Sequence, residues 1–72
     1  MEDQRQLINF TVACINEFAH EYQIEDKDVF QYLYRFNGIK FIKENYDIEH
    51  TMPFSTIIED LTIICKKNGG KI

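Results

Sequence analysis

The chain has 72 residues, of which 44% are hydrophobic and 14% aromatic, and its formal net charge is −4 at pH 7. This length and composition predict one small folded domain over residues 1–72 and exclude an intrinsically disordered chain. A chain of this size buries only about 60% of the surface that its unfolded form exposes, so we expect a protein partner or self-association to complete its core.

The charge and the hydropathy of the sequence argue against nucleic-acid and membrane partners. The basic residues are scattered, apart from Lys66, Lys67 and Lys71, so we expect no nucleic-acid partner. The sequence shows no signal peptide and no apolar stretch long enough to cross a bilayer, so we expect no membrane association and a cytoplasmic location. Cys14 and Cys65 each lie within an apolar helical stripe, which predicts two buried thiols rather than a disulfide or a metal site.

Two helices are expected in the first half of the chain. Apolar residues recur every three or four positions over residues 3–22 and again over residues 26–36, which is typical of amphipathic helices. The apolar stripe of the first helix is wide enough to contact two neighbours and includes a continuous ridge with helical spacing: Ile8, Val12, Ile15, Ala19 and Tyr22. Asn37-Gly38 is predicted to end the second helix, because glycine readily adopts the left-handed conformation that closes helices.

Tyr32 and Arg35 fall outside the main apolar ridge of the second predicted helix. Side chains off this ridge are expected to face solvent, and tyrosine and arginine are enriched at protein–protein interfaces. We therefore predict that these two residues form an exposed patch that contacts a protein partner.

Two further helices complete the predicted fold. A short apolar-periodic run predicts a helix over residues 39–46, which packing must hold because two turns are not stable alone. Pro53 suits the first turn of the last helix, which is predicted over residues 53–67. With one proline and three glycines in the chain, the sequence predicts an all-α protein, a compact array of about four helices.

The segment between the last two helices carries a recognisable motif. Tyr46, Asp47, His50 and Thr51 form a Tyr-Asp-x-x-His-Thr signature, and Ile58, Glu59, Asp60 and Leu61 form a hydrophobic-acid-Asp-hydrophobic run. On these motifs the chain resembles a bacterial family catalogued as domain of unknown function 3791. The resemblance covers nearly the whole chain and implies a compact helical domain with no established activity. It also implies an accessory or antitoxin-like role beside a neighbouring toxin-type protein.

The signature residues have a chemical interpretation. Asp47 and His50 lie three positions apart, so on a helical turn the carboxylate could orient the imidazole for catalysis, with Thr51 as a nearby hydroxyl. Nothing in the sequence supplies an oxyanion hole, and one histidine with scattered carboxylates lacks the ligand spacing of a zinc site. We therefore expect no cofactor and no metal.

Turn chemistry explains the same residues without a substrate. Tyr46 is predicted to bury its ring at the end of the third helix, Asp47 to accept backbone N–H groups, and Thr51 to cap the last helix. His50 is predicted to bond a carboxylate or a carbonyl across the turn, with Asp60 as the candidate carboxylate.

Three functions remain open from the sequence. The favoured hypothesis is a non-enzymatic module for protein–protein interaction that binds a partner or a second copy, since the chain shows no complete catalytic set. The first alternative is a small ligand-binding or catalytic protein that uses Asp47, His50 and Thr51. The second alternative is a nucleic-acid regulator of the helix-turn-helix type, built on the second and third helices with Lys40 and Lys43 facing outward.

Overall fold

The protein is helical throughout, with short connections. The computed structural model describes residues 2–72 and places five helices there: α1 (Glu2–Tyr22), α2 (Asp26–Arg35), α3 (Gly38–Glu44), α4 (Tyr46–Glu49) and α5 (Phe54–Lys67). The predicted all-α class and the four longer helices are confirmed. The additional helix, α4, is a four-residue turn within the segment that carries the signature.

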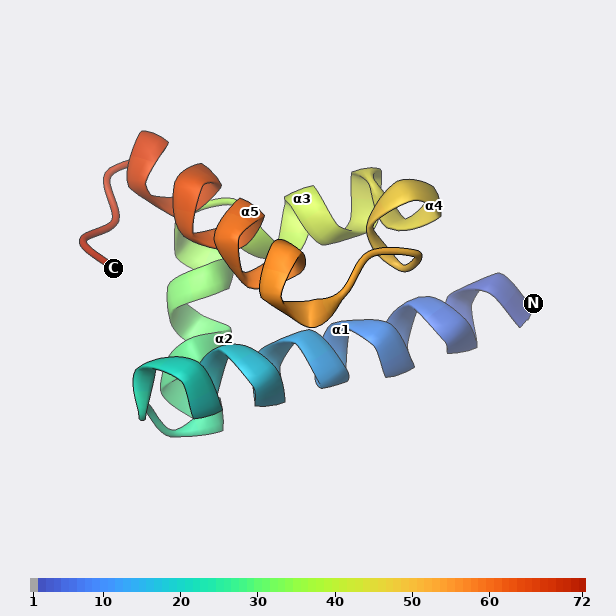
Figure 1. Ribbon diagram of the computed structural model, residues 1–72, viewed down its shortest axis with the longest axis horizontal. Coiled ribbons are helices and arrows are strands. Elements are labelled where there is room, and N and C mark those ends of the chain that lie inside the picture. The colour runs from blue at the N-terminus through green and yellow to red at the C-terminus, as the bar shows by residue number, and fades with distance from the viewer. Residues whose placement is uncertain (1) are drawn as a thin grey trace.

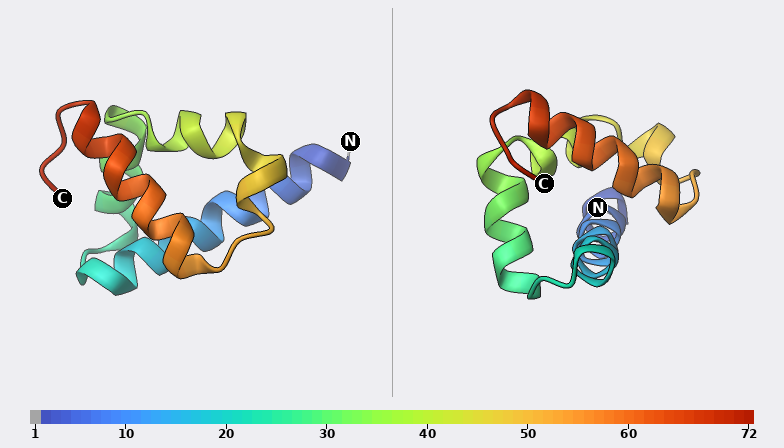
Figure 2. Two further views of the ribbon diagram at one scale, coloured as in Figure 1. Left: turned by 45° about the horizontal axis from the view of Figure 1, so that its top comes forward. Right: turned by 60° about the vertical axis from the view of Figure 1, so that its left-hand side comes forward.

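Helix α1 is the longest helix and lies along the base of the molecule in the view of Figure 1. Helix α2 rises from the C-terminal end of α1, and α3 returns above α1 in the direction of its N-terminus. Helix α5 crosses on one side of this arrangement and packs against α1 and α3 (Figure 2). The α4 turn lies above the N-terminal half of α1, where Tyr46 contacts Phe10.

One hydrophobic core joins α1, α2, α3 and α5. Its fully buried side chains are Cys14, Phe18, Val29, Leu33, Ile42, Ile57, Leu61 and Cys65. The predicted burial of both cysteines is therefore confirmed, and both are free thiols. Burial raises the pKa of Cys14 to about 12 and the pKa of Cys65 to about 11, because the interior disfavours the charged thiolate.

The predicted apolar ridge of α1 lies only partly in the core. Ile8 is 62% exposed and Val12 is 49% exposed, whereas Cys14 and Phe18 are fully buried. Helix α1 is apolar over a wide stripe, so more than one ridge has helical spacing, and the other helices cover the side that carries Cys14 and Phe18. Ile8 and Val12 are therefore left on the outer surface.

In the turn between α2 and α3, Asn37 and Gly38 adopt conformations that differ from those predicted. Asn37 adopts the left-handed conformation, with φ 70°, whereas Gly38 is the buried first residue of α3. A Cβ atom at Gly38 would lie 2.8 Å from Leu33 Cδ2 and 3.2 Å from Cys65 Sγ. Glycine is needed here because α3 approaches α2 and α5 too closely to admit a side chain.

The third predicted helix, over residues 39–46, ends earlier than expected, at Glu44. The backbone N–H and the side-chain Nδ2 of Asn45 both donate to the Phe41 carbonyl, each at 3.0 Å. The backbone bond is the last ordinary helical bond, and α3 ends because Asn45 itself departs from helical dihedral angles, with φ −118° and ψ 23°. Tyr46 therefore begins α4 instead of closing α3. Pro53 precedes the first turn of α5 rather than lying within it.

Candidate functional site

Stacked rings hold the signature segment together. Tyr46 begins α4 and His50 follows its end, and their rings are nearly parallel with centroids 4.5 Å apart. His50 Nδ1 lies 2.6 Å from the Tyr46 carbonyl oxygen, so this nitrogen carries a proton and donates it. Phe10 of α1 packs edge-on against Tyr46, with ring centroids 5.5 Å apart. The predicted bond from His50 to a carbonyl is therefore present, within a single turn of chain.

The other signature residues do not assemble around His50. Thr51 Oγ1 donates to the Ile48 carbonyl at 2.7 Å, and α5 begins without a side-chain cap. The predicted Thr51 cap is wrong, because its hydroxyl is already bonded within the preceding turn. Asp47 is exposed on α4. The structure thus places these residues in one short segment but gives His50 and Thr51 separate backbone partners.

Glu49 is the buried acid of this segment, and the sequence interpretation missed it. Its side chain is 5% exposed, and its enclosed Oε1 atom accepts no N–H or O–H group from another residue. Asp60 of α5 is the neighbouring acid, and a hydrogen bond between the two carboxyl groups forms only when one of them holds a proton. Burial, and to a smaller extent Asp60, raises the pKa of Glu49 to about 7.

This pair replaces the predicted contact between His50 and Asp60, which is wrong. His50 is exposed and bonds within its own turn, whereas Glu49 faces inward and reaches Asp60. Helical spacing could have revealed the acid, because Ile42, Tyr46 and Glu49 follow one another at intervals of four and three. Because Ile42 is fully buried, this spacing favours an inward position for Glu49, although the chain leaves the helical conformation between them at Asn45.

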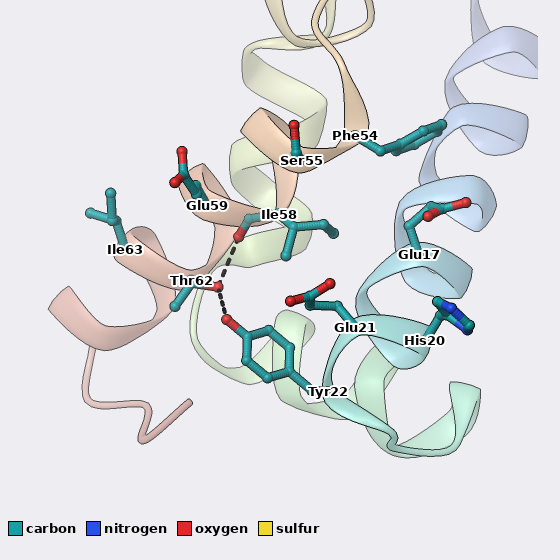
Figure 3. Close-up of a pocket in the computed structure, with 10 residues that line it drawn as sticks. All are labelled: Glu17, His20, Glu21, Tyr22, Phe54, Ser55, Ile58, Glu59, Thr62 and Ile63. Atoms are coloured by element: carbon teal, nitrogen blue, oxygen red, sulfur yellow. Dashed lines mark hydrogen bonds between the residues drawn. The ribbon is translucent and has the colours of Figure 1, made fainter.

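An acidic groove runs between the C-terminal half of α1 and α5, with a volume of about 740 Å³ (Figure 3). Its lining includes the carboxylates of Glu17, Glu21 and Glu59 but no lysine or arginine. The Tyr22 hydroxyl lies 2.8 Å from Thr62 Oγ1 and joins the two helices at one end of the groove.

An apolar groove lies between α1, α2 and α3, with a volume of about 570 Å³. Most of its lining is apolar: Leu7, Ile8, Val12, Ile15, Phe30 and Ile39. Lys43 of α3 is the charged side chain of this lining, which contains no carboxylate from residues 4–72. Ile8 and Val12, the outward-facing residues of α1, meet Phe30 here, and Phe30 is itself 47% exposed.

A comparison with known protein families identifies the family of the chain. The family model described as "Protein of unknown function (DUF3791)" matches residues 9–68, most of the chain. The chain belongs to this family. The family resemblance inferred from the sequence is thereby confirmed. No curated protein and no solved structure matches the chain.

Of the two residues that were predicted to form an exposed patch, only Arg35 is exposed in this DUF3791 protein. Its guanidinium carbon lies 5.5 Å from the centre of the Phe36 ring. Tyr32 is half-buried, and its hydroxyl lies 2.9 Å from the N–H nitrogen and 3.2 Å from the carbonyl oxygen of Ile72. The expected exposure of Tyr32 is wrong, because this side chain anchors the C-terminal tail.

Three further features of the DUF3791 protein bear on its chemistry. Among residues 4–72, no three His, Cys, Asp or Glu side chains converge as a metal site would require. Over that same part of the chain, no helix combines the length and the apolar character needed to cross a membrane. Lys40 and Lys43 are exposed on α3, as predicted, but that helix has only seven residues.

Proposed function

We propose that this DUF3791 protein is a non-enzymatic helical interaction module that binds a protein partner through the apolar groove. The observation that carries the proposal is the exposure of three large apolar side chains, Ile8, Val12 and Phe30, around one concave surface. Apolar side chains gain free energy when they leave water, and a contiguous apolar patch on a small protein is typical of an interaction site.

The exposed area is large enough to matter for binding. Fully burying a side chain of this kind contributes about 1.5–3 kcal/mol, and Ile8, Val12 and Phe30 are each roughly half exposed. Covering all three would therefore contribute about 2–4 kcal/mol before the costs of association. This contribution suits the centre of an interface whose rim adds further contacts.

The two alternatives have less support. Catalysis at the signature would need the imidazole to bond its carboxylate and its hydroxyl, but His50 Nδ1 bonds the Tyr46 carbonyl and the Thr51 hydroxyl bonds the Ile48 carbonyl. Nucleic-acid binding would rest on Lys40 and Lys43 in a protein whose net charge is −4. The finer form of our proposal is an accessory or antitoxin-like role, in which the partner is a toxin-type protein.

The native partner provides the test. The tagged protein captures candidate partners from a bacterial extract, mass spectrometry identifies them, and a purified candidate is titrated by calorimetry against the wild type and two variants. Val12→Glu places a charge in the apolar groove. Ile63→Glu is the matched control, because Ile63 is 57% exposed on α5 and does not line that groove.

The proposal expects binding to weaken at least about tenfold in Val12→Glu and to persist in Ile63→Glu. Circular dichroism confirms that both variants keep the wild-type helix content. Equal affinity for all three proteins would refute the proposal.

A further inference from the structure

We infer that the apolar groove receives an amphipathic helix of a different protein, one that carries carboxylates beside its apolar stripe. This inference rests on the proposed function and names the occupant of the groove. The shape of the groove, its charge and the consequence of pairing two copies of the chain each support it.

The apolar groove has the dimensions of a helix-binding site. Its α1 wall runs from Gln4 to Ile15, about three turns or 16 Å of helix. Ile39 and Lys43 line it from α3, one turn apart, and Phe30 contributes from α2. A helix laid along α1 presents apolar residues at i, i+4 and i+7, which together span about 10 Å and so fit within this length.

The charge of the apolar groove favours an acidic occupant. Among residues 4–72, whose side chains the structure describes, its lining carries Lys43 and no carboxylate, although the chain as a whole has a net charge of −4. The acidic groove beside α5 has the opposite character, with three carboxylates and no lysine or arginine. A carboxylate on the side of the occupant that faces α3 would pair with Lys43, whereas a lysine there would oppose it.

A second copy of the chain fits the apolar groove less well. In a symmetric dimer the same surface of both copies meets, so the groove of one copy would pack on the groove of the other. This arrangement would bring Lys43 from both copies into one interface, and within residues 4–72 neither lining supplies a carboxylate to offset the two charges. The groove therefore favours a different chain that brings the carboxylates itself.

Two designed peptides test this inference. Each has about 18 residues, enough to form a helix, with leucine at i, i+4 and i+7. One peptide carries glutamate on both sides of the leucine stripe, and the other carries lysine at the same positions. Fluorescence anisotropy at low ionic strength, where charges are weakly screened, gives their affinities.

We expect the wild type to bind the glutamate peptide at least about tenfold more tightly than the lysine peptide. The net charge of −4 alone would give the opposite order, so the result separates local from overall charge. Lys43→Glu should remove or reverse the preference. Lys67→Glu makes the same charge change at an exposed position outside the groove and should leave the preference intact. Val12→Glu should weaken the binding of both peptides.

Three results would overturn the inference. Equal binding of the two peptides, or tighter binding of the lysine peptide, would show that charge does not select the occupant; loss of that binding in Val12→Glu would still support the proposed function. A dimer in light scattering that Val12→Glu dissociates would identify a second copy as the occupant. Failure of a monomeric protein to bind either peptide would also reject the inference, and the native-partner titration would then decide the proposed function separately.

Discussion

Replacing Glu49 by glutamine should abolish a pH dependence of stability that this side chain creates. Glu49 is 5% exposed and neighbours Asp60, with which it hydrogen-bonds only when one of the two carboxyl groups holds a proton. The glutamine amide has nearly the same shape, and its N–H group can donate to the Asp60 carboxylate at any pH. The substitution therefore keeps the contact between α4 and α5 while removing its titration.

The direction of the effect follows from the raised pKa of Glu49. Folding moves this pKa from 4.5 to about 7, so between these values the folded state holds a proton that the unfolded state has lost. The resulting stability is complete below pH 4.5 and is lost as the pH rises through about 7, at about 1.4 kcal/mol per pH unit. The total loss is about 3 kcal/mol. It is a large share of the roughly 4–11 kcal/mol expected for a chain of this length.

Urea unfolding monitored by circular dichroism, repeated from about pH 4.5 to about pH 8 at fixed ionic strength, measures this effect. The free energy of unfolding of the wild type should fall over this range. Relative to it, the Glu49→Gln variant should gain stability as the pH rises, up to about 3 kcal/mol at the alkaline end. Taking the difference between the two proteins cancels the titrating groups that they share.

Glu44→Gln is the matched control, because Glu44 is an exposed acid at the end of α3. This variant should keep the wild-type dependence on pH. Parallel profiles for the wild type and Glu49→Gln would contradict the reasoning, and so would a Glu49→Gln variant that is less stable than the wild type at the alkaline end.

Three further substitutions test one close helix contact and two hydrogen bonds. Gly38→Ala should lower the free energy of unfolding by about 1–3 kcal/mol, because the added methyl group would meet Leu33 at 2.8 Å; unchanged stability would argue against this close helix approach. His50→Gln should lower stability by about 1 kcal/mol in thermal unfolding while partner binding persists, whereas loss of binding at full stability would make His50 a functional residue. Tyr32→Phe should speed the hydrogen exchange of the Ile72 amide in NMR, and an unchanged rate would show that the tail is held otherwise.

The helices were predictable where one face is clearly apolar. Helix α5 was expected over residues 53–67 and is observed over Phe54–Lys67, with Ile57, Leu61 and Cys65 on its buried side. Helix α1 shows the limit of this approach, because its apolar residues fit more than one ridge. Which ridge is buried depends on where α3 and α5 pack, and periodicity within α1 carries no information about that.

The signature segment was less predictable because local and distant interactions compete there. The turn chemistry of His50 was foreseeable, since its carbonyl partner lies four residues away. The Glu49–Asp60 pair has no comparable local signal, because two acids are ordinarily kept apart by charge repulsion. Their contact arises only when the core brings α5 beside α4, so it is a property of the whole fold.

Two departures from ordinary burial reduce the stability that this chain could reach alone. Ile8 and Val12 remain partly in water and forgo their full burial energy, and Glu49 places an acid in the interior. A partner that binds only the folded state adds about 2.7 kcal/mol of stability when its concentration is about 100 times the Kd. This gain is close to the roughly 3 kcal/mol that the acid removes above neutral pH. Under the proposed function, partner binding would thus offset the cost of Glu49, and the folded population would come to depend on the partner most strongly at high pH.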